Sequence, residues 1–264
     1  MRNLDSATRD IHVALTQIDL AATLGWQDIK QRYRRSRIGP FWLTISMGVM
    51  IGVLGLVFGS VFNSTMPEFL PFLTAGLILW TFYSTLINEG CLAFIQSDSM
   101  IKQLPLPLFV HVMRVIWRNL IILAHNLVIL PIVFIVFMKP VSPVMLLFIP
   151  GLILSTLAIS SMALIAGILC TRFRDLTPII ASSLQVVFYI TPILWMPSLL
   201  SGQKAFFLLD SNPFYHLVEI VRAPLLGYVP STSNWVLSLG TAVFGWGIAL
   251  LLYARFKYRI SYWL

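Results

Sequence analysis

Apolar residues along the chain fall into six long runs that are separated by short polar segments. As a helix rising about 1.5 Å per residue, each run is long enough to cross, or nearly cross, the ~30 Å hydrocarbon core of a membrane. The runs cover residues 41–62, 69–94, 115–137, 144–170, 179–195 and 235–254. The pattern therefore predicts an all-α integral membrane protein with six transmembrane helices.

A different periodicity precedes the first run. Apolar residues recur there every three or four positions, which places them on one face of a helix. They are Leu15, Ile18, Ala22, Trp26, Ile29 and Tyr33. Five cations follow in the segment KQRYRRSRIGPFW, residues 30–42. A helix of this kind is typical of one that lies on a membrane surface, and the alternative is a soluble helix packed on a partner.

The Lys and Arg residues indicate how the helices are oriented. Of the 18, only Lys139, Lys204 and Arg222 fall outside the N-terminal segment, the second and fourth connections and the C-terminal end. Because cations beside membrane spans are retained on the cytoplasmic side, both termini are predicted to be cytoplasmic. A net charge of +8 would suggest nucleic-acid binding in a soluble protein, but 58% hydrophobic and 11% charged residues exclude that class.

Residues 206–228 are apolar but are interrupted by three charged residues and two prolines. A seventh span here would place the last cations outside, so we interpret the segment as short re-entrant helices in the outer leaflet. Glu219 and Arg222 are three residues apart and are expected to pair on one helix face. The predicted organisation is a cytoplasmic segment 1–38 with the amphipathic interfacial helix, a six-span domain 39–255 and a cytoplasmic tail 256–264.

Four glycines of the first run lie on one helix seam, and small residues there let a neighbouring helix approach closely in lipid. They are Gly48, Gly52, Gly55 and Gly59. The neighbour is either a second protomer or another span of this chain. Two cytoplasmic connections, residues 95–107 and 170–178, are compact, which fits docking surfaces for a cytoplasmic partner or ordinary connections.

The chain carries none of the common catalytic motifs. It has no G-x-x-x-x-G-K-[ST] phosphate-binding loop, no H-E-x-x-H and no G-x-S-x-G. We therefore expect no enzyme activity and no metal or cofactor on this chain, and any ATP-driven work must come from another subunit. Glu89 is the one clear acid within a span; it is a candidate proton relay, although pairing with Arg114 or Arg118 is favoured.

Aromatic residues are concentrated in the first, second and fifth spans. They are expected either to form the interfacial belt at headgroup depth or to line a passage in which flat rings stack on sugar units. The candidates for the passage are Trp42, Phe58, Tyr83, Phe188, Tyr189 and Trp195. Those near Pro192 are the best placed, because a proline-bent helix presents its residues to a cavity.

Three sequence features together resemble one known family. They are RYRRSRIGPFW before the first span, the proline-bounded loop after the second span, and NPFYHLVEIVRAPLLG, residues 212–227. This combination resembles the permease subunit of type-2 ABC transporters that export O-antigen, capsule or teichoic-acid polysaccharides. The resemblance extends over essentially the whole chain. It implies a homodimer in the bacterial inner membrane that moves a lipid-linked polysaccharide and binds two copies of a cytoplasmic ABC ATPase subunit, which holds ATP and Mg.

The resemblance also implies roles for particular residues. Coupling to the ATPase would fall on Arg32, Arg34, Arg35, Ser97, Asp98, Lys102 and Gln103. A periplasmic gate would be formed by Asn212, Pro213, Phe214, Arg222 and Gly227, with Glu219 as the partner of Arg222.

Other functions remain open at this point. One is an ion-gradient-driven secondary transporter centred on Glu89, although a single intramembrane acid and the lack of an inverted repeat weigh against it. Another is an ABC exporter of drugs or small lipids, since a fold does not set its substrate. A membrane-embedded sugar transferase is disfavoured, because the acids Glu68, Asp210 and Glu219 have no spacing typical of a catalytic site.

Overall fold

The computed structural model describes the chain except for residues 1, 35–38, 40, 63 and 200–205. Every regular element among the described residues is helical, and five stretches are long and apolar enough to cross a membrane. They are Phe41–Val61 (α3), Met66–Cys91 (α4), Phe109–Leu127 with Ile129–Val136 (α6 and α7), Pro143–Leu147 with Phe148–Arg172 (η2 and α8), and Thr232–Trp263 (α12). The helical membrane architecture predicted from the apolar pattern is confirmed.

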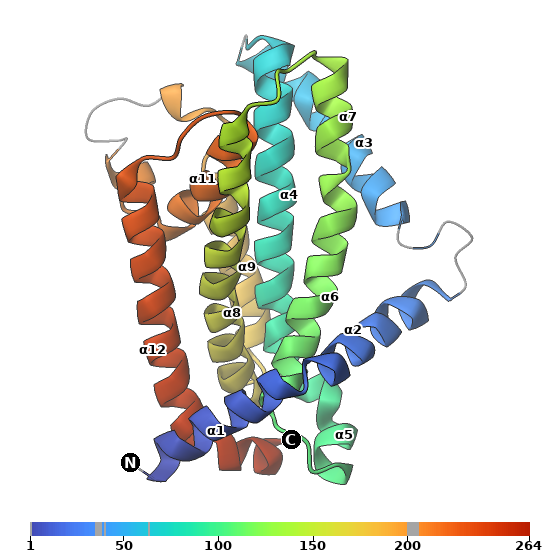
Figure 1. The fold of residues 1–264 in the computed structure, drawn as a ribbon, viewed down its shortest axis with the longest axis vertical. Helices are drawn as coiled ribbons and strands as arrows, with labels where there is room; N and C mark the ends of the chain where they lie inside the picture. Colours follow the sequence, from blue (N-terminus) through green and yellow to red (C-terminus); the bar gives the residue numbers. More distant parts are fainter. Residues whose placement is uncertain (1, 35–38, 40, 63, 200–205) are drawn as a thin grey trace.

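The predicted fifth span is shorter than expected. Its helix, α9, covers Leu176–Ile190, and 15 residues span only about 22 Å. The chain then passes through η3 (Pro197–Leu199), η4 (Phe206–Asp210) and α11 (Pro213–Leu225) before α12. Both chain ends lie at the same end of the bundle (Figure 1), as an even number of crossings requires. The sixth crossing and the re-entrant position of α11 stay predictions.

Helix α4 forms the centre of the bundle. It is buried along most of its length because α3, α6, α8, α9 and α11 all pack against it. Helix α8 in turn packs on α11 and along α12 (Figure 1). By contrast, α3 contacts mainly α4 and α6, and much of its apolar surface is exposed. Movements of α4 would therefore act directly on most of the long helices, and on α12 only through α8 and α11.

The predicted surface helix is in fact two helices. α1 covers Arg2–Thr16 and α2 covers Ile18–Tyr33, and the chain turns between them at Gln17. Figure 1 shows both lying across one end of the bundle, at a large angle to the long helices. α1 packs on α12, and α2 packs on α6.

The two faces of α2 have different environments. Ala21, Gly25 and Ile29 are buried against the bundle. Gly25 allows a close approach, because an added Cβ would lie 3.0 Å from the carbonyl oxygen of Arg114 on α6. Trp26 remains exposed, as do Leu15 and Ile18 of the predicted apolar stripe. A helix in contact with lipid would need such an exposed apolar stripe.

The glycine seam of α3 has two different halves. Gly55 and Gly59 are buried, and an added Cβ would meet Leu70 and Met66 of α4. Gly48 and Gly52 have nothing within 4 Å of an added Cβ. One half therefore serves packing within this chain, and contact of the open half with a second protomer stays a prediction.

A close contact between α4 and α8 yields a stability prediction. A Cβ added to Gly90 of α4 would lie 2.7 Å from Cβ and 2.9 Å from Cα of Ala163 on α8. Because backbone on both helices would have to move apart, we expect Gly90→Ala to lower the free energy of unfolding by about 1–3 kcal/mol. Thermal unfolding of the detergent-purified protein measures this change. Gly240→Ala on α12 is the matched control, since nothing lies within 4 Å of an added Cβ there and alanine favours the helix. Equal melting temperatures for the two variants would contradict the prediction.

Candidate functional site

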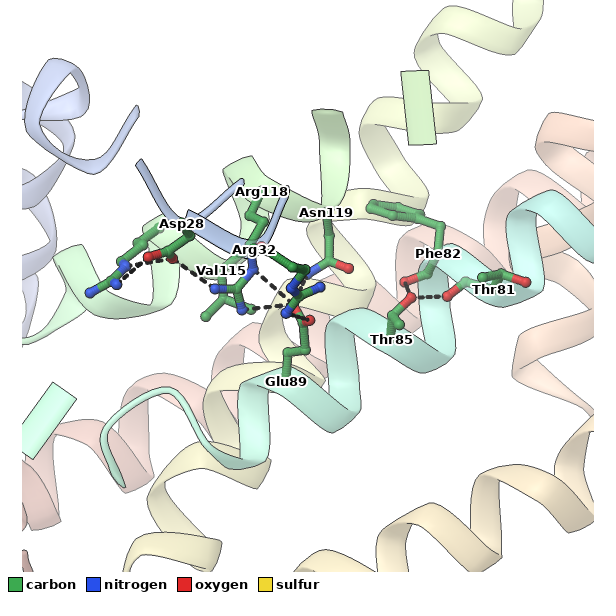
Figure 2. A network of polar contacts seen from close by, with 10 residues as sticks. Asp28, Arg32, Thr81, Phe82, Thr85, Glu89, Val115, Arg118 and Asn119 are labelled. Atoms are coloured by element: carbon green, nitrogen blue, oxygen red, sulfur yellow. Dashed lines mark hydrogen bonds and ion pairs between the residues drawn. The ribbon is translucent and has the colours of Figure 1, made fainter. Parts of the chain in front are cut away.

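A network of charged side chains joins α2 to the bundle. Asp28 of α2 accepts hydrogen bonds from Arg114 Nε and Arg118 Nη1 of α6, each at 2.7 Å. Glu89 of α4 accepts from Arg118 Nη2 at 2.8 Å, from Asn119 Nδ2 at 2.7 Å and from Arg32 Nη2 of α2 at 3.1 Å. Figure 2 shows these side chains converging where α2 crosses α4 and α6. We call Asp28, Arg32, Glu89, Arg114, Arg118 and Asn119 the α2 network.

The α2 network pairs its charges and holds most of them away from water, although Arg32 stays about half exposed. The side chain of Arg118 is only 8% exposed, and Asp28 and Glu89 are largely covered. Unpaired charges would be costly in this position, whereas each acid here has at least two donors. The sequence-based pairing of Glu89 with Arg118 is therefore confirmed, and Arg114 pairs with Asp28 instead. A carboxylate occupied by three donors is poorly suited to carry protons as a relay.

The pKa of Asp28 sets the acid limit of α2 docking. Burial raises this pKa, but the hydrogen bonds and charges of Arg114 and Arg118 outweigh burial and hold it below its ordinary value of 3.8. A lowered folded-state pKa means that the stabilisation is complete above pH 3.8 and is lost as the pH falls through the folded-state pKa. We therefore expect α2 to stay docked at pH 5 and to detach only below 3.8.

The distance between spin labels at two exposed positions, Gln27→Cys and Leu104→Cys, measures this docking. The expected result is a constant distance down to pH 4 and a broadened distribution below it. Asp28→Asn is the control, because it removes the titrating group and should abolish this transition. Detachment at pH 5 in the otherwise unmodified protein would contradict the prediction.

The residues expected to couple to an ATPase are divided between two places. Arg32 belongs to the α2 network, Arg34 lies exposed just beyond α2, and Arg35 is outside the described residues. The others lie in η1 (Ile95–Ser97) and α5 (Asp98–Gln103), at the same end of the bundle as α1 and α2 (Figure 1). Asp98 and Lys102 form an ion pair of 2.8 Å, Gln103 is exposed and Ser97 is buried. The two groups share an end of the molecule but not a hydrogen-bond network.

A second buried charge lies near the other end of the bundle. Arg222 of α11 is fully buried and donates to Glu219 at 2.6 Å, as the three-residue spacing predicts. Its Nη1 donates to the carbonyl oxygen of Pro192 at 2.6 Å, and its guanidinium lies 4.0 Å from the ring centroid of Phe72 on α4. Pro192 lies two residues after the end of α9. Arg222 therefore connects α4, α9 and α11; we call Phe72, Pro192, Glu219 and Arg222 the Arg222 cluster.

Asn212 makes a second connection between α9 and α11. Its side-chain oxygen caps α11 by accepting from the amides of Phe214 and Tyr215, at 3.0 and 3.4 Å. Its Nδ2 donates to the hydroxyl of Thr191 at 2.9 Å. Two of the six predicted gate residues, Asn212 and Arg222, therefore hold the same turn after α9.

The remaining predicted gate residues shape α11 itself. Pro213 occupies the first helical position, which suits its missing N–H. Gly227 follows the helix with φ of 86°, a conformation that favours glycine. Phe214 packs on Trp80 of α4, with ring centroids 5.7 Å apart.

A groove runs between α3, α4 and α9. Its volume is about 270 Å³, and it is lined by both rings and polar groups: Met50, Leu77, Trp80, Thr81, Ser84, Asn88, Ala181, Leu184, Gln185 and Phe188. The rings of Trp80 and Phe188 lie 5.7 Å apart. Thr81, Ser84 and Asn88 follow one another at helical spacing on one face of α4. We call this the α4 groove.

Only one of the six predicted passage aromatics lines the α4 groove. Phe188 does so, whereas Tyr83 is fully buried and donates its hydroxyl to the carbonyl oxygen of Leu217. The other four lie at different depths in the structure: Trp42 and Tyr189 are largely exposed, and Phe58 and Trp195 are partly buried. Trp195 donates to the carbonyl oxygen of Tyr189 at 3.2 Å.

Sequence reasoning missed several residues of these sites. Asp28 and Asn119 were not selected, and neither were the polar groups of the α4 groove. The polar spacing of Thr81, Ser84 and Asn88 within an apolar span was the available signal, because polar side chains in a span avoid lipid. Among the described residues, no group of His, Cys, Asp and Glu has an arrangement suited to a metal ion.

Comparisons with known proteins agree with the family that the sequence motifs resemble. A family model described as ABC-2 type transporter matches residues 20–226. The O-antigen export system permease protein RfbA of Myxococcus xanthus is 27% identical over 209 residues, which cover 77% of this chain and 79% of that protein. The protein of the same name from Klebsiella pneumoniae is 25% identical over 252 residues, covering 92% and 94%.

Proposed function

The chain belongs to the ABC-2 type transporter family, and from this premise we propose that it exports a lipid-linked polysaccharide when a separate subunit hydrolyses ATP. Membership confirms the family predicted from the sequence motifs and makes the chain a multi-pass permease rather than a catalytic enzyme. O-antigen is the proposed polysaccharide, because both relatives described above are named as O-antigen export permeases. The alternative within the family is an exporter of drugs or small lipids.

The α4 groove is the observation that carries the proposal. Sugar units have apolar ring faces and hydroxyl edges, so a passage for them needs both flat rings and hydrogen-bonding groups. The α4 groove offers Trp80 and Phe188 beside Thr81, Ser84 and Asn88. Carboxylates are absent from the groove lining, which suits a neutral chain moving through rather than a tightly bound ion.

The α2 network supplies a route from an ATPase to this groove. Glu89 holds Arg118 and Arg32, and its neighbour Asn88 lines the groove. A push on α2 is therefore transmitted to α4 at the residue next to the groove wall. In the proposed cycle, two ATPase subunits act on α2 and α5, and the open half of the α3 glycine seam faces a second protomer in an inner-membrane homodimer with cytoplasmic termini.

The proposal is tested by reconstituting the chain with a candidate ABC ATPase subunit and measuring ATP turnover and glycan export. A stable complex with ATP-dependent export supports the proposal. Export driven by an ion gradient without the ATPase would overturn it, and ATP-dependent export of drugs but not glycan would replace the substrate.

The groove itself is tested by Ser84→Trp, which fills it. We expect this variant to keep ATP turnover but to lose glycan export. Val243→Trp on the exposed face of α12 is the matched control, and it should export normally. Normal export by Ser84→Trp at equal abundance would exclude the α4 groove as the passage.

A further inference from the structure

Three arginines converge on a cavity where α8 and α12 end. The cavity has a volume of about 360 Å³ and lies at the end of the bundle where α1 crosses α12 (Figure 1). Its lining consists of Ile168, Leu169, Arg172, Phe173, Arg255, Phe256, Arg259 and Trp263. We call it the arginine pocket. No carboxylate is among these lining residues, so the local charge is strongly positive.

Aromatic rings hold two of the three guanidinium groups. Arg172 lies 5.1 Å from the ring centroid of Phe173 and 5.2 Å from that of Trp263. Arg255 lies 5.5 Å from the ring centroid of Phe256. Stacking on a ring uses the flat face of a guanidinium and leaves its N–H edge free, which is the edge that binds phosphate through two parallel hydrogen bonds.

The arginine pocket differs from the other cationic sites at this end of the molecule. Arg114 and Arg118 are each paired with a carboxylate, and so is Lys257 on α12. Within the described part of the chain, Arg172, Arg255 and Arg259 form no ion pair. The retention of cations on the cytoplasmic side explains why arginines occur near this end, but it does not require three of them to line one cavity without an acid.

The remaining lining defines the kind of anion that fits. Leu169 contributes a partly exposed apolar wall, with Ile168 buried behind it, and the helices above expose apolar side chains such as Leu251. Trp263 has the amphipathic ring that favours the depth of lipid head groups. An occupant that satisfies both parts needs a phosphate for the guanidinium groups and a hydrocarbon chain for the apolar wall.

We propose that the arginine pocket binds the phosphate group of an anionic phospholipid in the leaflet on the side of α1 and α2, with an acyl chain against Leu169 and the apolar side chains exposed above it. Binding at this position bridges the ends of α8 and α12, the two helices that flank the pocket. The lipid is thus a structural ligand of the transporter and is distinct from the transported polysaccharide.

Native mass spectrometry of the full chain in detergent, with phosphatidylglycerol or phosphatidylcholine added, tests this proposal. We expect one phosphatidylglycerol per chain to bind in preference to phosphatidylcholine. Each lost arginine should weaken binding about fivefold, which corresponds to ~1 kcal/mol per cation near a membrane surface. Arg172→Gln should therefore lower the affinity about fivefold, and Arg172→Gln with Arg259→Gln about 25-fold.

Arg174→Gln is the matched control, because Arg174 is an exposed arginine two residues beyond the end of α8 that does not line the pocket. The proposal is overturned if Arg174→Gln weakens binding as much as Arg172→Gln, since only general charge would then matter. It is also overturned if phosphatidylcholine binds equally well, or if inorganic phosphate at the lipid's concentration displaces the lipid. Arg172, Arg174 and Arg259 are all exposed, so the variants are expected to fold, and unchanged melting temperatures in the absence of lipid check this.

Discussion

Arg222→Ala is expected to abolish glycan export and to lower the free energy of unfolding by about 3–5 kcal/mol, because truncation breaks a buried ion pair. Arg222 is fully buried, so its removal leaves the Glu219 carboxylate without a partner and the Pro192 carbonyl without its donor. The space beside Phe72 would also be left empty. The variant therefore loses one of the two described hydrogen-bonded connections between the end of α9 and α11, and keeps the one through Asn212.

Two measurements separate loss of fold from loss of transport. Thermal unfolding in detergent reports stability, and glycan display is compared at equal amounts of protein in the membrane. Arg222→Lys retains the charge but cannot reproduce the planar fork that reaches Glu219 and Pro192 together, so an intermediate loss is expected. Normal display and an unchanged melting temperature for Arg222→Ala would remove the Arg222 cluster from the proposed transport mechanism.

Arg118→Ala is expected to uncouple ATP hydrolysis from export. Among the described residues, Arg118 alone pairs with both Asp28 of α2 and Glu89 of α4. Losing the contact with Asp28 should weaken the attachment of α2 to α6 by about 1.5–3 kcal/mol, and losing the contact with Glu89 frees α4 from α6 at the same point. The ATPase complex would then continue to turn over ATP, while movement of α2 would reach α4 only through the half-exposed Arg32–Glu89 pair, and export would fall.

Arg114→Ala is the control for this second prediction. It removes contacts of Asp28 but leaves the bridge through Arg118 intact, so it should reduce export less. A double-mutant cycle of Asp28→Ala and Arg118→Ala should give a coupling energy of about 0.5–3 kcal/mol, the range for residues in one network. Equal export by the Arg118→Ala and Arg114→Ala variants would show that the bridge to α4 is not needed.

Local patterns in the sequence predicted which segments are membrane helices. In lipid, a helix satisfies its own backbone hydrogen bonds, so length and apolar composition alone are strong signals. The pairing of Glu219 with Arg222 was predictable for a similar reason, because residues three apart lie on one helix face. The proposed orientation likewise uses only the distribution of Lys and Arg along the chain.

Partners distant in the chain were decided by tertiary structure. Periodicity could place Asp28 on the polar face of a helix. Only the crossing of α2 with α6 brings Asp28 to Arg114 and Arg118, so that Glu89 pairs with Arg118 and not with Arg114. The glycine seam shows the same limit, since four equivalent positions in sequence divide into a packed and an open half.

The sequence by itself thus determined the helical membrane architecture and the family, because both depend on signals carried within single segments. Only the tertiary structure decided how Arg222 reaches Pro192, which side chains form the α4 groove and that Arg172, Arg255 and Arg259 share a cavity. The physical reason is that a helix period fixes the direction of a side chain on its own helix, whereas its partner depends on the crossing of helices far apart in the chain.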